Sequence, residues 1–70
     1  MENAFYLEKL LKPREVAEML NISRSLVYQL IRSQEIPVVR IKSTVRVKAS
    51  DLAEFINGNK KKNVKQLPLF

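Results

Sequence analysis

The chain has 70 residues, a formal net charge of +6, no cysteine and no histidine. This length suffices for one small domain with a thin core, and the composition excludes a disulfide framework and a cysteine-ligated zinc site. No run of about 18 apolar residues is present, and the N-terminus lacks the pattern of a signal peptide. We therefore expect a cytoplasmic protein that needs no cofactor or metal and is not an enzyme.

The positive charge is concentrated in the C-terminal part of the chain. Residues 1–23 hold three basic and four acidic side chains, whereas residues 24–70 hold ten basic and three acidic ones, so the two parts carry net charges of −1 and +7. Phosphate neutralisation supplies most of the non-specific affinity of proteins for nucleic acid. The asymmetry therefore favours a nucleic-acid partner.

A polar leader, residues 1–9, precedes the first predicted helix. Pro13 suits the first turn of a helix, because its missing N–H has no partner to lose there. Glu15 is favoured in the same turn by the helix dipole. Lys12 stands at the N-cap position and is a poor cap, so we expect some fraying at this end.

Two apolar stripes predict two helices joined by a tight turn. The first stripe comprises Val16, Met19 and Leu20, and the second comprises Ile22, Val27, Leu30 and Ile31. Between them, Asn21 tolerates the left-handed conformation that ends a helix, and Ser23 is a good N-cap for a helix that runs to about Ser33. A second helix held in this way can present its outer face to a DNA major groove.

The outer face of this second helix carries side chains that can form hydrogen bonds and no acidic group. The residues predicted to contact DNA are Ser23, Arg24, Ser25, Tyr28, Gln29 and Arg32. Among them, Ser25 and Gln29 are expected to contact bases, and the two arginines to contact phosphates. The alternative, a helical hairpin that only packs a core, explains neither this face nor the basic segment that follows.

A basic hairpin is predicted next. Residues 35–37 end the helix at a proline, residues 38–42 and 45–48 alternate apolar and basic positions, and residues 43–44 supply the turn. The period of two is expected to place Val39, Ile41, Val45 and Val47 on one face, and Arg40, Lys42, Arg46 and Lys48 on the other. We expect the basic face to grip phosphates or a minor groove as a wing, the alternative being a solvated surface.

A short closing helix and a tail complete the chain. Ser50 is expected to cap a helix from Asp51 to about Asn57, with Leu52, Phe55 and Ile56 closing the core. The tail, residues 58–70, has neither helical nor strand period and is predicted to be flexible. The tail lysines expected to add weak, salt-sensitive affinity for DNA are Lys60, Lys61, Lys62 and Lys65.

These elements together resemble excisionase-type winged-helix domains, which are related to the mercury-resistance-regulator type. The motifs that carry the resemblance are Leu10-Leu11-Lys12-Pro13-Arg14-Glu15-Val16-Ala17-Glu18-Met19-Leu20-Asn21-Ile22-Ser23-Arg24-Ser25, Val27-Tyr28-Gln29-Leu30-Ile31-Arg32, Glu35-Ile36-Pro37-Val38-Val39-Arg40-Ile41 and Ser50-Asp51-Leu52-Ala53-Glu54-Phe55-Ile56. The resemblance spans residues 10–56 and implies a second helix in the major groove and a wing on the adjacent minor groove or backbone. It implies a role as a recombination directionality factor, working beside an integrase on a bacterial or mobile-element site, or as a small transcriptional regulator.

The sequence departs from this family at three positions. Lys12 replaces a usual Thr or Ser, Asn21 replaces a common Gly, and Leu26 replaces a small polar residue. Leu26 is expected either to expose an apolar group on the DNA side, where it could touch a thymine methyl, or to fold into the core.

The end of the tail carries a second resemblance. Gln66-Leu67-Pro68-Leu69-Phe70 is similar to the peptide by which bacterial proteins dock on the replicative sliding clamp. In such a peptide Leu67, Leu69 and Phe70 supply apolar contacts, and Gln66 hydrogen-bonds the rim of the pocket. The alternatives are a chance match and a tail that folds back on the domain.

The sequence therefore predicts a mainly α fold with a small β-hairpin, a winged helix-turn-helix. Its expected parts are a leader (1–9), a DNA-binding domain (10–57) and a basic tail (58–70). The predicted function is sequence-specific binding of double-stranded DNA, and the alternative is a replication-associated adaptor or inhibitor that binds the sliding clamp. A domain of this size without a coiled coil is expected to be monomeric in solution and to bind DNA cooperatively.

Overall fold

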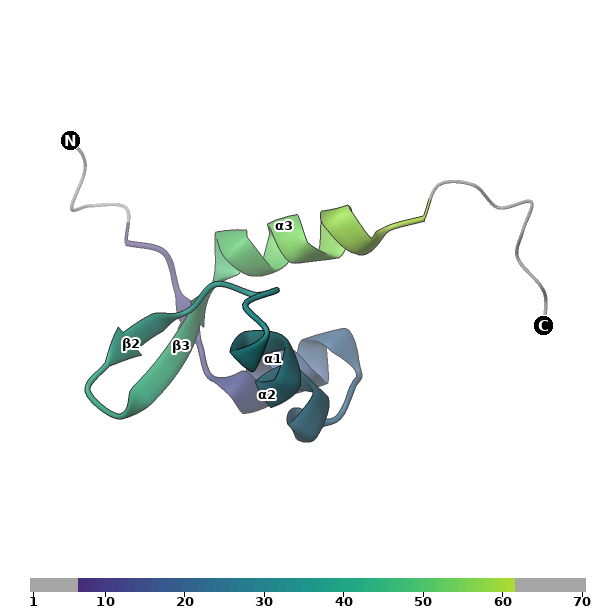
Figure 1. The fold of residues 1–70 in the computed structure, drawn as a ribbon. Coiled ribbons are helices and arrows are strands. Elements are labelled where there is room, and N and C mark those ends of the chain that lie inside the picture. Colours follow the sequence, from purple (N-terminus) through teal and green to yellow (C-terminus); the bar gives the residue numbers. More distant parts are fainter. Residues whose placement is uncertain (1–6, 62–70) are drawn as a thin grey trace.

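The computed structural model describes residues 7–61 and confirms the predicted fold class, a mainly helical winged helix-turn-helix. Its elements are β1 (Leu10–Leu11), α1 (Pro13–Leu20), α2 (Arg24–Arg32), β2 (Val39–Ile41), β3 (Thr44–Lys48) and α3 (Ala49–Asn59). Figure 1 shows α1 and α2 packed together, with the hairpin of β2 and β3 projecting to one side and α3 leading away from its base. Within residues 7–61 no helix is both long and apolar enough to cross a membrane.

The start of α1 is held by Glu15 rather than by its N-cap residue. Lys12 forms no side-chain cap, but its backbone N–H donates to Glu15 Oε1 over 2.8 Å. This is the half of a capping box that the third residue of the helix supplies. The same hydrogen bond is the main reason why the pKa of Glu15 is lowered.

The turn between α1 and α2 is a Schellman motif. Asn21 adopts the left-handed conformation with φ 58° and ψ 46°. The N–H of Ile22 donates to Ala17 O over 3.0 Å, and the N–H of Asn21 donates to Glu18 O over 3.2 Å. These are the two bonds that define the motif, and the predicted role of Asn21 is confirmed.

The end of α2 repeats the motif without its usual residue. Gln34 has φ 62°, the N–H of Gln34 donates to Ile31 O over 3.0 Å, and the N–H of Glu35 donates to Leu30 O over 2.9 Å. Glycine or asparagine normally occupies this left-handed position. The sequence therefore gave no sign of the turn, although the predicted end of the helix near Ser33 is correct.

The core is small and draws on every element except β2. Its buried residues are Leu11, Val16, Ala17, Val27, Ile31, Ile36, Val47 and Leu52. Two predicted members are absent from it: Met19 is 63% exposed and Ile56 is 46% exposed. Each lies on a helix whose neighbouring apolar residues already fill the narrow buried face, so the helical spacing overestimated its width. Ile36, which is only 1% exposed, fills the core from the segment after α2.

The sheet contains a strand that the sequence did not predict. Its order is β1-β3-β2, and β1 pairs antiparallel with β3, with Leu10 opposite Lys48 and Leu11 opposite Val47. Two residues are too few to show a period of two, so this strand carried no recognisable pattern. It fastens the beginning of the domain to the base of the wing.

The predicted division of the hairpin into an apolar and a basic face is wrong. The turn consists of Lys42 and Ser43, so that Arg40 lies opposite Val45 and Val39 lies opposite Arg46. A two-residue turn pairs odd-numbered with even-numbered positions, and directly opposite residues share a face. Each face of the hairpin therefore carries both apolar and basic side chains: Val39 and Ile41 lie with Arg46 on one face, and Val45 and Val47 lie with Arg40 on the other.

Helix α3 begins earlier and ends later than predicted. It starts at Ala49 after Lys48, which forms no side-chain cap, and it continues through Gly58 to Asn59. Ser50 is thus not the N-cap; its N–H instead donates to Glu8 Oε2 over 2.9 Å. A glycine in the last turn costs a helix little, and Asn59 Nδ2 donates to Phe55 O over 2.8 Å.

The left-handed turn at Asn21 yields the first prediction. Replacement of Asn21 by alanine should lower the free energy of unfolding by about 1 kcal/mol, because a Cβ without a compensating polar group is strained at this φ. Replacement by glycine should have a much smaller effect. Urea denaturation of the two variants tests this, and equal losses in both would show that the backbone conformation at Asn21 is not the cause.

The contact between Glu8 and Ser50 yields a prediction of pH dependence. The pKa of Glu8 lies below its ordinary value of 4.5, chiefly because the Ser50 backbone N–H donates to it. A folded-state pKa below the unfolded one contributes stability that is present above pH 4.5 and is lost as the pH falls through the lowered pKa.

Between pH 6 and pH 3 the stability of Glu8→Gln should therefore fall less than that of the unaltered protein. Glu54→Gln, at an exposed position on α3, is the matched control and should behave as the unaltered protein does. Parallel pH profiles for the unaltered protein and Glu8→Gln would contradict the assignment.

Candidate DNA-binding surface

The exposed side of α2 brings most of the predicted residues together. Val27 and Ile31 face the core, and the remaining positions of the helix point outward or lie at its edge. A shallow hollow on this side is lined by Ser23, Ser25, Leu26, Tyr28, Gln29 and Arg32. Arg24 is exposed at the first position of the same helix. The helix therefore offers hydroxyl, amide and guanidinium groups over a continuous outer surface.

Ser23 is exposed and is also the N-cap residue of α2. Its Oγ accepts a hydrogen bond from the Leu26 N–H over 3.0 Å, which satisfies one of the free donors at the start of α2. The hydroxyl proton of Ser23 is left available, so this residue can donate one hydrogen bond to a ligand while it caps the helix.

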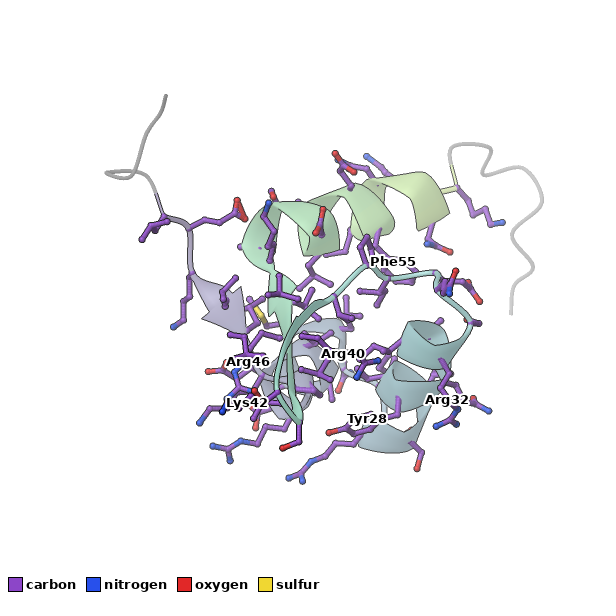
Figure 2. The ribbon with its side chains drawn as sticks, turned by 60° about the vertical axis from the view of Figure 1, so that its left-hand side comes forward. Tyr28, Arg32, Arg40, Lys42, Arg46 and Phe55 are labelled. Carbon is purple, nitrogen blue, oxygen red and sulfur yellow. The ribbon has the colours of Figure 1, made fainter. Side chains whose placement is uncertain are left out.

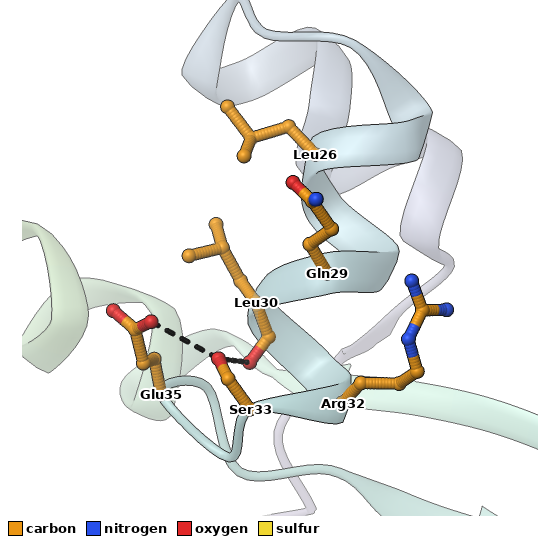
Figure 3. Close-up of a pocket in the computed structure, with 6 residues that line it drawn as sticks. All are labelled: Leu26, Gln29, Leu30, Arg32, Ser33 and Glu35. Atoms are coloured by element: carbon orange, nitrogen blue, oxygen red, sulfur yellow. Dashed lines mark hydrogen bonds between the residues drawn. The ribbon is translucent and has the colours of Figure 1, made fainter.

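Leu26 is exposed and does not belong to the core, so the alternative in which it folds into the core is wrong. It is 40% exposed and lies beside Gln29 in a hollow on the outer side of α2 (Figure 3). Its other side borders an apolar cleft that Phe55 and Ile56 line from α3. An apolar group thus stands directly next to the amide on the exposed surface.

An acidic residue that the helical spacing did not predict lies at one edge of this surface. Glu35 lines the same hollow as Gln29 and Arg32. Ser33 Oγ lies 3.0 Å from Glu35 Oε2 and 3.2 Å from Leu30 O (Figure 3), and its single proton can serve one of them at a time. The turn after α2 carries Glu35 back to the helix, which is why the position of Glu35 could not be read from helical spacing.

The four basic residues of the hairpin occupy different environments. Arg40 lies between the hairpin and α2, and Arg46 lies on the other side of the hairpin (Figure 2). Arg46 is half-buried, and its Nη1 donates to Val45 O over 2.9 Å. Lys42 forms the exposed turn with φ 56°, and Lys48 stands at the other end of the strand, opposite Leu10.

The tail residues are only partly within the described chain. Lys60 and Lys61 are exposed beyond the end of α3. The other predicted tail residues, Lys62, Lys65, Gln66, Leu67, Leu69 and Phe70, lie outside the described residues.

Within residues 7–61 there is no group of three or more His, Cys, Asp or Glu side chains that could hold a metal ion.

A helix-turn-helix with an exposed polar second helix, followed by a basic hairpin, defines a DNA-binding domain of the winged-helix class. The family described as "Helix-turn-helix domain" matches residues 10–60, which is most of the chain. The chain belongs to this helix-turn-helix domain family and is a protein that binds double-stranded DNA. No curated protein and no solved structure matches it at a significant level.

The capping role of Ser23 can be separated from contact with DNA. Replacement of Ser23 by alanine removes the acceptor for the Leu26 N–H and should lower the free energy of unfolding by about 1 kcal/mol. Replacement by aspartate keeps an acceptor and should restore most of that loss. Thermal and urea denaturation of both variants in the absence of DNA provide the measurement. If Ser23→Ala is as stable as the unaltered protein, the cap does not hold the start of α2.

Proposed function

We propose that this protein binds a specific sequence of double-stranded DNA with α2 in the major groove and the β2–β3 hairpin on the adjacent backbone or minor groove. The observation that carries the proposal is the exposed face of α2, which presents Arg24, Ser25, Tyr28, Gln29 and Arg32 beside a basic hairpin. Of the biological roles compatible with this surface, we propose an excisionase-like recombination directionality factor or a small transcriptional regulator.

The side chains of α2 divide by chemistry. Gln29 can form two hydrogen bonds with an adenine edge, and Ser25 can bond to several bases. Arg24 and Arg32 suit phosphate oxygens, which position a protein without specifying sequence. Leu26, half-exposed next to Gln29, can contact a thymine methyl, and an amide beside an apolar group suits an A·T base pair.

The size of the domain bears on how specificity is reached. A single module of this kind buries roughly 600–1,000 Å² on DNA and covers only a few base pairs. We therefore propose that several copies bind repeated sites cooperatively, or that one copy binds beside a partner such as an integrase. In free solution we expect a monomer.

Mapping of the bound sites across the genome of the host would choose between the two biological roles. Sites beside an integrase gene or an attachment sequence would support a function in excision. Sites confined to promoters, with changed transcription of the adjacent genes when the protein is absent, would support regulation. Uniform occupancy without a sequence motif would contradict specific binding altogether.

The alternative role in replication depends on residues 66–70, which lie outside the described residues. It is supported only by the similarity of Gln66-Leu67-Pro68-Leu69-Phe70 to clamp-binding peptides. Titration of purified clamp with the full chain and with a Leu69→Ala, Phe70→Ala variant tests it. Binding that the double variant loses, with unchanged affinity for DNA, would establish a second partner.

Gln29 is the residue whose loss should affect specificity most. Gln29→Ala should weaken binding to the cognate site by about 1–3 kcal/mol and affect binding to random DNA much less, because only a base contact depends on sequence. Fluorescence anisotropy with the two duplexes gives both values. Asn57→Ala, which removes an exposed amide from α3, is the matched control, and equal weakening by Gln29→Ala on both duplexes would refute the base contact.

A further inference from the structure

A second hollow lies between the last turn of α2 and the wing. Its polar groups come from Arg32 on α2, Gln34 in the turn, and Arg40 on β2. The rest of its lining is apolar and includes Ile36 and Val38. Arg32 and Arg40 thus line one concave site, although seven residues lie between them in the sequence.

The two walls of this hollow are formed by segments of backbone that the turn after α2 and the pairing of β2 with β3 hold in place. The left-handed Gln34 (φ 62°) reverses the chain directly after α2, and Ile36, with 1% exposure, anchors the returning segment in the core. On the other wall, Arg40 lies opposite Val45 and therefore projects from the face of the hairpin that faces α2 (Figure 2). The separation of the two arginines is consequently set by packed backbone rather than by a free loop.

The charge around Arg32 differs on its two sides. Toward Leu26 and Gln29 its hollow also contains the Glu35 carboxylate. Toward the wing its hollow contains Arg40 and no acidic residue. Within residues 7–61, moreover, neither Arg32 nor Arg40 makes a side-chain hydrogen bond to another protein group, whereas Arg46 donates to Val45 O. An anion is therefore favoured on the wing side, where both guanidinium groups have free donors.

We propose that this hollow binds one phosphodiester group of the DNA backbone, held jointly by Arg32 and Arg40. The inference rests on the proposed function, since α2 must lie in the major groove for its last turn to meet the backbone beside the wing. Guanidinium groups hold phosphate oxygens through paired, directional hydrogen bonds, which a lysine ammonium does not reproduce. One shared phosphate would fix the position of α2 relative to the wing on DNA.

The test measures whether the two arginines act on the same phosphate. We compare the full-length protein with Arg32→Ala, Arg40→Ala and the double variant, in fluorescence anisotropy titrations on one duplex at several salt concentrations. Each single variant should bind roughly tenfold more weakly. The double variant should be little weaker than either single one, and its plot of log K against log salt should flatten by about one unit, as expected for one lost phosphate contact. Arg14→Ala, at an exposed position on α1, is the matched control.

Additive losses and a slope change of about two units in the double variant would show two separate phosphates and overturn the proposal, as would unchanged binding by both single variants. A methylphosphonate scan of the duplex adds a second measurement, in which one neutral linkage should weaken the unaltered protein but not the double variant. If no linkage behaves in this way, the shared contact is absent. Failure of the unaltered protein to bind any duplex would instead overturn the proposed function itself.

Inorganic phosphate separates a DNA site from a free-anion site. Titrated into the unaltered protein, it should leave the NMR signals of the Arg32 and Arg40 Nε groups unshifted at millimolar concentration, whereas the duplex should shift both. Saturable shifts with inorganic phosphate alone would assign the hollow to a small anion and overturn its assignment to the DNA backbone.

Discussion

The left-handed turn at Asn21 is the constraint on which the DNA-binding surface depends. The Ile22 N–H donates to Ala17 O, and at the next residue the Ser23 hydroxyl accepts a hydrogen bond from the Leu26 N–H. These local bonds end α1 and begin α2 within three residues, so the angle between the helices is fixed by backbone geometry. A core of eight buried residues is too thin to impose that angle alone. Short-range hydrogen bonds therefore help to set the angle between α1 and α2, whereas in larger domains core packing sets such angles.

The wing depends on a second turn and on β1. Gln34 repeats the Schellman geometry at the end of α2, and Ile36 then enters the core. At its base the wing is held by pairing of β1 with β3. The contact of Glu8 with the N–H of Ser50 ties the same region to α3. The hairpin is thereby fastened at its base, and the Lys42–Ser43 turn forms its exposed end.

Sequence patterns succeeded where a single residue or a long period determines the structure. Asn21 and Ser23 marked the turn and the cap because their side chains suit those conformations. The patterns failed where pairing across the chain decides. The faces of the hairpin follow from the length of its turn, which alternation within one strand does not reveal, and β1 exists only because β3 pairs with it. The left-handed conformation of Gln34 was also not predicted. Glutamine has no preference for this conformation, and the chain adopts it where it returns to bury Ile36 in the core.

These misjudged features matter most for the interface with DNA. With the predicted register, all four basic residues of the hairpin would have shared one face and acted alike. With the observed register, Arg40 faces α2 whereas Arg46 is half-buried against its own strand. The hairpin therefore has two chemically different sides, and only one adjoins the helix that meets the bases. A phosphate bound on that side would contact both the hairpin and α2 and would therefore orient the helix on DNA. A charge on the far side of the hairpin would contact the hairpin alone.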